Sequence, residues 1–334
     1  MKIVFAWTPD FAATYLESLA KDKRFNITAI ISQEDKKIWR KQILTETETK
    51  QIWTKYWTPV FQPKTKSEIT EILKKEKPDF FVVVAYWKIL PKESLEVAKF
   101  NINVHWSILP KYRWASPIQS AVLNWDEETW ISIMNVEEKM DVWAVWNINK
   151  CKIEKFDTSE EIFEKLKKFS ENFWDDLEKI FKEWDDSKNL SNPEKNFKPT
   201  IQDENLATYC KKISKEDWKI NFEKESAKEI FQKLNSFTPW PWIFCQFWDK
   251  KLKILKADYS ENFKENFLDK IKNFFTQKNF WKIFETWEWK WKRVFIKTKS
   301  WNLELLEIQL EWKKSQDISA FINGHKDFVW NLLT

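Results

Sequence analysis

A single glycine, Gly324, stands among 334 residues, while the same chain holds 24 tryptophans. Average usage is roughly 7% glycine, which would give about 23 glycines in a chain of this length. Glycine adopts positive φ in tight turns and lets backbones approach closely, and a bulky indole side chain does neither. A chain without glycine has almost no residue suited to sharp turns, so the role of its tryptophans has to be settled first.

The tryptophans lie in patterns typical of glycine. Asn124-Trp125-Asp126 and Phe247-Trp248-Asp249-Lys250 would be hairpin-type turns if glycine replaced the indole. We therefore predict that UGA codons, which the source organism reads as glycine, are written as tryptophan at almost every position. Trp240, which lies between Pro239 and Pro241, is the position that we interpret as an authentic tryptophan.

The alternative is a genuinely tryptophan-rich protein that binds carbohydrate or a membrane interface. Its aromatic residues would gather on one face or in a belt. The tryptophans of this chain have no common period and fall at the ends of predicted strands and helices. This distribution favours masked glycines over a binding surface.

The bulk properties indicate a protein of two domains in the cytoplasm. Charged residues make up 32% of the chain, and we find neither a secretory leader nor an apolar run long enough to span a membrane. Cys151, Cys210 and Cys245 form no disulfide framework and no metal-binding pair, so we expect buried thiols and no metal. The net charge of +5 is compatible with a polyanionic partner. We expect a monomer.

The first part of the chain alternates strands with helices, which predicts an α/β fold with a doubly wound, mostly parallel sheet. Polar residues with two prolines follow at 186–204 and indicate a linker. Short alternating segments then predict a second domain with an all-β, OB-like barrel and one helix. The predicted division is 1–185, 186–204 and 205–334. The predicted strands are Lys2–Ala6, Ile27–Ile31, Phe80–Ala85, Asn101–Val104, Ile131–Val136, Ile148–Ile153, Lys219–Phe222, Lys251–Leu255, Arg293–Thr298 and Leu303–Leu310, and the predicted helices are Phe11–Leu19, Lys66–Lys75, one from the Thr158 capping box to about residue 185, and Ser226–Asn235.

Histidine chemistry is confined to two positions, His105 and His325. His105 follows a buried strand, where open α/β sheets place their ligands. Asn103 lies two residues earlier and therefore on the same face of the strand. An amide donor and an acid/base group would converge there, although a satisfied surface histidine is also compatible with this pair alone. Asp141 follows the next predicted strand, and His325 is interpreted as part of a turn.

The longer string 103–119, NVHWSILPKYRWASPIQ, resembles the signature N-x-H-x-S-L-L-P-x-x-R-G-x-x-P-I of the methionyl-tRNA formyltransferase family. The resemblance extends over nearly the whole chain, through FAWTPDFA at 5–12, AYWKILP at 85–91 and FTPWPW at 237–242. Tryptophan stands where the family carries glycine. Ile108 replaces a leucine of the family, and Val142 and Ala144 depart from its Asp-Thr-Gly-Asp pattern.

The resemblance implies transfer of a formyl group from 10-formyltetrahydrofolate to the α-amine of methionine on initiator tRNA. It implies that Asn103 binds the oxyanion, that His105 moves the proton, and that Asp141 orients and charge-stabilises His105. No metal is required. The implied folate-binding residues are Ser107, Ile108, Leu109, Pro110, Tyr86, Lys88, Ile89 and Leu90.

The polar loop Gln33–Lys50 is too long for a simple connection between a strand and a helix. In the family the corresponding loop enters the tRNA acceptor stem, which implies a tRNA contact by Lys36, Lys37, Arg40 and Lys41. The chain lacks the family's Pro-Ala-Gly-Arg-Gly-Lys pattern there. A solvated charged loop is the other interpretation.

Two other functions remain open at this stage. One is a folate-dependent formyltransferase or hydrolase that acts on a nucleotide or an amino sugar. The other is an RNA-binding protein that keeps the fold without catalysis. The Thr238–Pro241 segment argues against the first, and the presence of Asn103, His105 and Asp141 argues against the second.

Overall fold

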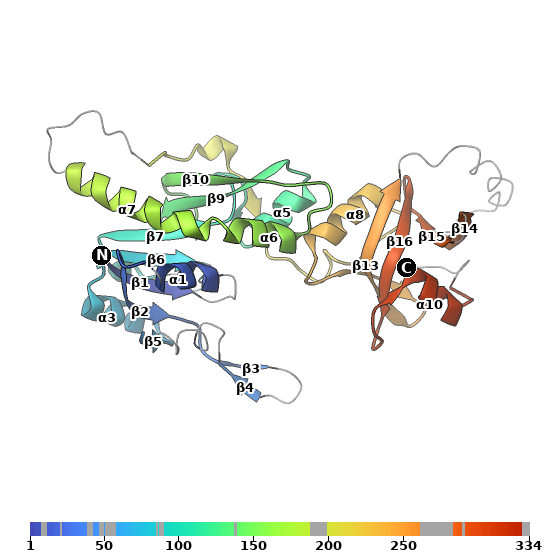
Figure 1. Cartoon of the computed structure of the whole chain (residues 1–334), viewed down its shortest axis with the longest axis horizontal. Coiled ribbons are helices and arrows are strands. Elements are labelled where there is room, and N and C mark those ends of the chain that lie inside the picture. The colour runs from blue at the N-terminus through green and yellow to red at the C-terminus, as the bar shows by residue number, and fades with distance from the viewer. Residues whose placement is uncertain are drawn as a thin grey trace. The chain divides into compact units, whose positions relative to one another are not determined.

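The structure, a computed structural model, describes residues 1–7, 12–20, 22–38, 43–46, 50, 58–84, 86, 90–136, 139–187, 199–260, 283–288 and 291–328. Two compact units divide the chain (Figure 1). The first unit comprises Met1–Ile118, Glu127–Ile153 and Ile162–Lys211, and the second comprises Gln119–Asp126, Glu154–Glu161 and Lys212–Thr334.

A seven-stranded sheet forms the centre of the first unit, in the order β10-β9-β7-β6-β1-β2-β5. The five strands from β7 to β5 are parallel, and β9 and β10 continue the sheet antiparallel. All five side chains of β6 are buried, as expected for a strand covered on both faces. The predicted doubly wound sheet is confirmed. Its strands are β1 (Lys2–Trp7), β2 (Asn26–Ile31), β5 (Val60–Phe61), β6 (Phe80–Val84), β7 (Phe100–His105), β9 (Glu128–Asn135) and β10 (Val145–Lys152).

Helices cover both faces of this sheet (Figure 1). On one face, α1 (Ala12–Ala20) and α7 (Ser170–Ser187) pack together, and the rings of Tyr15 and Phe173 lie 5.4 Å apart. On the other face, Ile69 and Leu73 of α3 (Lys66–Glu76) join a core with Val4 and Phe81. The short helix α4 (Lys92–Leu95) lies beside α3.

The long helix predicted up to about residue 185 is two helices. α6 (Ser159–Lys167) ends and α7 begins at Ser170. The amide of Phe169 bonds to the carbonyl of Leu166, three residues back, which tightens the last turn and breaks the α-helical pattern. The predicted capping box is present, since Glu161 accepts from the Thr158 amide at 2.7 Å and donates its own amide to the Thr158 hydroxyl.

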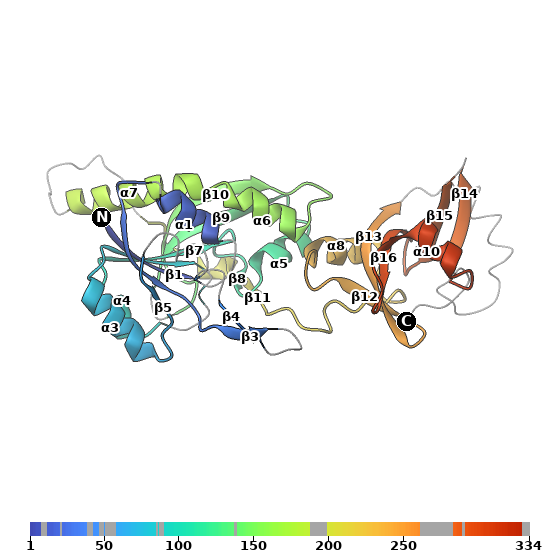
Figure 2. The ribbon, with the colours of Figure 1, turned by 60° about the horizontal axis from the view of Figure 1, so that its bottom comes forward.

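The second unit contains antiparallel strands in the order β12-β13-β16-β15-β14, with β17 paired to β16 (Figure 2). Buried residues alternate along β16, and α8 packs on β13 and β16. A domain of antiparallel strands is therefore confirmed. Its elements are α8 (Ala227–Ser236), β12 (Ile243–Phe247), β13 (Lys250–Ser260), β14 (Ile283–Glu288), β15 (Trp291–Lys297), β16 (Asn302–Leu310), β17 (Gln316–Asp317) and α10 (Ile318–Gly324).

Several short features lie outside the two large sheets. The predicted strand Lys219–Phe222 is only a single bridge from Lys219 to Phe244, because turns flank it at 215–218 and 222–224. α5 (Pro117–Leu123) and the 3-10 helix η2 (Glu204–Leu206) are short helices, and β8 (Arg113–Trp114) pairs in parallel with β11 (Tyr209–Cys210). Within the described residues, no helix combines the length and the apolar character needed to cross a membrane.

The predicted loop Gln33–Lys50 contains a small hairpin of β3 (Lys36–Ile38) and β4 (Ile43–Thr45). A polar clamp closes its base. Gln62 donates from its side-chain amide to the Gln33 carbonyl and to Asp35, at 2.7 Å each. Lys50 forms an ion pair with Asp35 at 3.0 Å, so the hairpin leaves the sheet from a fixed point.

Candidate active site

Asn103 and His105 lie at the carboxyl end of β7, in the middle of the sheet. Asn103 stands in register between Val83 of β6 and Met134 of β9, and His105 pairs with Ser132. His105 is buried and Asn103 is half-buried. Within the described part of the chain, the Asn103 side chain makes no hydrogen bond, which leaves its amide available to a ligand.

Both ring nitrogens of His105 face protein oxygens. Nε2 lies 3.0 Å from the carbonyl oxygen of Tyr112, and Nδ1 lies 3.7 Å from Oδ1 of Asp141. Because a carbonyl only accepts, the first contact places a proton on Nε2. In a neutral ring the basic lone pair is then on Nδ1, the nitrogen beside the carboxylate. The spacing to Asp141 suits an ion pair rather than a direct hydrogen bond.

Asp141 occupies a tight turn with left-handed backbone, φ 58°. Aspartate tolerates this conformation better than most side chains. Its Oδ2 accepts a hydrogen bond from the Trp114 amide at 2.9 Å. Gln202 donates to the carbonyl oxygens of Asp141 and Trp143, at 3.0 and 2.6 Å. The carboxylate and the backbone that carries it are thus held separately.

The segment Ser107–Pro110 begins two residues after His105 and folds into a turn in which the Ser107 hydroxyl is buried. Ser107 donates to the carbonyl of Lys111 at 2.6 Å, and Ser132 donates to the carbonyl of Ser107 at 2.7 Å. Leu109 is buried in a small apolar cluster with Met134 and Val145, while Ile108 and Pro110 are half-buried. The Leu109–Pro110 peptide is cis. The turn is therefore anchored to β9.

Of the predicted folate loop, the structure describes Tyr86 and Leu90, whereas Lys88 and Ile89 lie outside the described residues. Leu90 is buried in the sheet core, and Tyr86 packs against the same cluster. The Tyr86 hydroxyl is buried and has no hydrogen-bond partner among the described residues. Burial raises the pKa of Tyr86 to about 12, so the phenol stays a neutral donor.

The predicted tRNA contacts are described only in part. Lys36 and Lys37 lie on β3, paired with Thr45 and Leu44, and nothing is described of their side chains. Arg40 and Lys41 lie outside the described residues.

Three residues near Asp141 escaped the sequence analysis as site residues. Arg113 is fully buried and donates to both carboxylate oxygens of Glu204, at 2.8 and 2.9 Å. The hydrogen bonds that Arg113 donates to Glu204 hold the Arg113 pKa above its ordinary value, and the same contact lowers the Glu204 pKa. Arg113 also donates to Gln202. A buried arginine needs a carboxylate, but no local pattern points to one 91 residues away.

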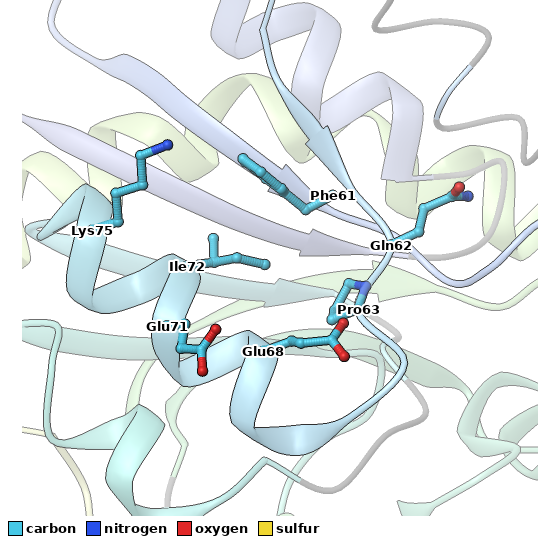
Figure 3. Close-up of a pocket in the computed structure, with 7 residues that line it drawn as sticks. All are labelled: Phe61, Gln62, Pro63, Glu68, Glu71, Ile72 and Lys75. Carbon is cyan, nitrogen blue, oxygen red and sulfur yellow. The ribbon is translucent and has the colours of Figure 1, made fainter.

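A surface pocket between β5 and α3 is lined by residues other than the candidate site residues (Figure 3). Phe61 and Ile72 form its apolar floor, and Glu68 and Glu71 stand at its side. Glu68 is engaged at the start of α3, where it accepts from the Lys64 amide and the Thr65 hydroxyl. None of the residues singled out from the sequence lines this pocket.

Two protein-family models match this chain, one in its N-terminal part and one in its C-terminal part. The family model "Formyl transferase" matches residues 1–174, and "Formyl transferase, C-terminal domain" matches residues 212–326. The methionyl-tRNA formyltransferase of Campylobacter jejuni subsp. jejuni is 37% identical over 330 residues, which is 97% of each chain. That of Caldicellulosiruptor saccharolyticus is 35% identical and covers 98% of this chain and 97% of its own.

Solved structures show the same fold at low identity. Methionyl-tRNA formyltransferase from Clostridium thermocellum superimposes with a TM-score of 0.54 at 18% identity, covering 78% of this chain and 95% of its own. HypX from Aquifex aeolicus in complex with tetrahydrofolic acid gives a TM-score of 0.60 at 13% identity, covering 98% of this chain and 48% of its own.

Proposed function

Because the chain belongs to the methionyl-tRNA formyltransferase family, we infer that it is an enzyme that formylates the α-amino group of methionine on initiator tRNA. We propose 10-formyltetrahydrofolate as the donor. The observation that carries the assignment is the group of Asn103, His105 and Asp141 at the carboxyl end of the central strands.

The proposed chemistry is acyl transfer to an amine. The methionyl nitrogen attacks the formyl carbon, a carbon–nitrogen bond forms, and the carbonyl oxygen becomes an oxyanion. Asn103 donates a hydrogen bond to that oxygen from an amide that no described residue occupies. The bond to N10 of the folate then breaks and expels the nitrogen as the leaving group.

His105 carries the proton between the two nitrogens. The Tyr112 carbonyl holds the Nε2 proton, so the ring accepts the proton of the attacking amine at Nδ1. Asp141 stabilises the resulting imidazolium from 3.7 Å, and the ring returns the proton to the departing folate nitrogen. The ring is thereby restored and no other acid or base is needed.

For the folate we propose the turn Ser107–Pro110 and the facing loop of Tyr86, Lys88, Ile89 and Leu90. The unpaired Tyr86 hydroxyl supports a polar ligand on that side, since a buried hydroxyl without a partner is costly. A solved relative of the same fold is described in complex with tetrahydrofolic acid.

For the tRNA we propose the β3–β4 hairpin, with phosphate contacts from Lys36, Lys37, Arg40 and Lys41. The polar clamp around Asp35 at the base of the hairpin supports this role, because it would hold the lysine-bearing hairpin at a constant angle to the sheet. We further propose a monomer in the cytoplasm, with a catalytic domain followed by a linker and a tRNA-binding domain. The bounds predicted from the sequence are 1–185, 186–204 and 205–334, whereas the first compact unit also includes the residues up to Lys211.

We also propose that almost every tryptophan except Trp240 is glycine in the protein as synthesised. Tryptophan is 24 of 334 residues, about 7%, yet six of the nine described non-glycine residues with positive φ are tryptophans. Apart from Asn and Asp, L-residues rarely adopt this region, whereas glycine adopts it readily. The indole N–H groups of Trp125, Trp130, Trp143 and Trp218 are buried without an acceptor among the described residues. Peptide masses of protein isolated from its source decide between the two residues.

The test of function is formylation of methionyl initiator tRNA with 10-formyltetrahydrofolate. The parent chain carries glycine at every tryptophan except Trp240, and His105→Ala and Asn103→Ala are compared with it. We expect transfer by the parent, none detectable in His105→Ala, and a kcat lower by about 100-fold in Asn103→Ala, because one oxyanion donor is lost. A folded parent that formylates an amino sugar nucleotide instead of the tRNA would overturn the assignment.

A further inference from the structure

The chain segment Thr200–Cys210, here called the connector, runs along the loops that carry the proposed catalytic groups. Thr200 forms a bridge with Val145, and β11 pairs with β8. Thr208 accepts a hydrogen bond from the Tyr112 amide at 2.9 Å. The connector therefore contacts the backbone after His105, at Tyr112–Trp114, and the backbone after Asp141, at Val145.

Gln202 is the connector residue that reaches the Asp141 turn. Its side chain is buried and uses its full hydrogen-bonding capacity. Oε1 accepts from Nε and Nη2 of Arg113, at 3.2 and 2.9 Å. Nε2 donates to the carbonyl oxygens of Asp141 and Trp143. Both acceptors are backbone atoms, so these bonds exist whether residue 143 is tryptophan or glycine.

Arg113 fixes the orientation of this amide. A guanidinium only donates and a carbonyl only accepts, so the Gln202 side chain cannot turn over without losing its bonds at both ends. Glu204 holds the guanidinium from the opposite side with two hydrogen bonds. Gln202 is therefore a rigid spacer between the buried Arg113 guanidinium, which is paired with the exposed carboxylate of Glu204, and the Asp141 turn.

We propose that Gln202 is a positioning residue for catalysis, which acts through Asp141 on His105. The proposal rests on the proposed function. Asp141 has left-handed backbone in a turn, and the two bonds from Gln202 fix the carbonyl groups at both ends of Asp141–Trp143. Without them the carboxylate would drift from Nδ1, and small displacements of catalytic groups cost large factors in rate.

The variant Gln202→Glu separates the two contacts of this side chain. A carboxylate still accepts from Arg113 but has no N–H group to offer the Asp141 turn. We expect kcat to fall roughly 10-fold while KM for both substrates changes by less than about twofold. The control is Asn205→Asp, the same amide-to-carboxylate change at an exposed connector position whose side-chain amide, among the described residues, bonds only to Asp203. We expect the control to match the parent.

Two readouts separate positioning from general loosening of the structure. The first readout is the single-turnover rate in a chain that carries Asp141→Asn. Adding Gln202→Glu to this chain should lower the rate less than about twofold, because the Asp141 carboxylate through which Gln202 acts on His105 is already absent. Hydrogen exchange of residues 139–146 should be faster in Gln202→Glu and unchanged in Asn205→Asp.

An unchanged kcat in folded Gln202→Glu, or the same loss of rate in both Asp141 backgrounds, would overturn the proposal. Failure of the parent to formylate the tRNA is a different result and counts against the proposed function. The exchange experiment needs no substrate, so unaltered exchange at 139–146 would still refute the positioning role on its own.

Discussion

Trp248 is a bulky residue at a turn position where the backbone has a positive φ. It occupies the first position of the two-residue loop between β12 and β13, with φ 56°, next to the Phe247–Lys250 pair. A positive φ at this position alone is the geometry of a type II′ hairpin, which takes glycine there. Trp248 is also largely exposed, so removing its ring costs little buried apolar surface.

We predict that Trp248→Gly stabilises the chain relative to Trp248→Ala by about 1 kcal/mol in urea unfolding. Both changes remove the ring and its stacking on Phe247, and only glycine relieves the left-handed backbone. Equal midpoints for the two variants would mean that residue 248 is not in that conformation.

The residues of the candidate site were predictable to different degrees. Spacing at the end of a strand predicts that Asn103 and His105 share one face, because strand periodicity is local, but their roles in the site were implied only by the family resemblance. Arg113, Gln202 and Glu204 could not be found this way, because their contacts join positions 89 and 91 residues apart. Only the folded chain shows which amide a buried guanidinium selects.

Elements with a strong period were predicted close to their observed bounds. β6 and α3 differ from their predicted ranges by a single residue, because burial on both faces and a Thr65 cap leave clear limits. The break between α6 and α7 was missed, since apolar positions continue across it at helical spacing. The β3–β4 hairpin was missed as well, because three-residue strands carry too little pattern.

The hairpin clamp gives a prediction at this scale. Asp35→Ala removes the acceptor shared by Gln62 and Lys50 and so frees the base of the hairpin. We expect KM for the tRNA to rise several-fold while KM for the folate stays at the parent value, both from steady-state formylation. Thr158→Ala, which weakens the capping box at the start of α6, is the matched control and should affect stability only. A higher KM for folate in Asp35→Ala would contradict the assignment of the hairpin to tRNA.

Over the whole molecule, carboxylates with lowered pKa values occur in both units. Bonds to Lys182 and then Arg24 lower the pKa of Glu178, and Arg113 lowers that of Glu204. In the second unit, the Ser226 amide and hydroxyl lower the pKa of Glu229. A folded pKa below the unfolded value gives stability that is complete above the unfolded pKa and is lost as pH falls through the folded one.

We therefore predict that the urea midpoint is nearly constant from pH 7 to about pH 5 and falls steeply below about pH 4. The net charge of +5 grows as carboxylates become protonated, and the added repulsion acts in the same direction. Equilibrium unfolding in matched ionic strength at several pH values measures this. A midpoint that rises on acidification would show that these contacts do not favour folding.

The pairing of β11 with β8 has a practical consequence for the design of truncated fragments and chimaeras. A fragment cut where α7 ends would keep every strand of the large sheet and yet expose the Arg113 guanidinium and the Asp141 turn to solvent. Chimaeras that exchange the C-terminal half between relatives should be joined after Cys210. A fusion point placed earlier would move Gln202 and Glu204, which contact Arg113 and the Asp141 turn, along with the second unit.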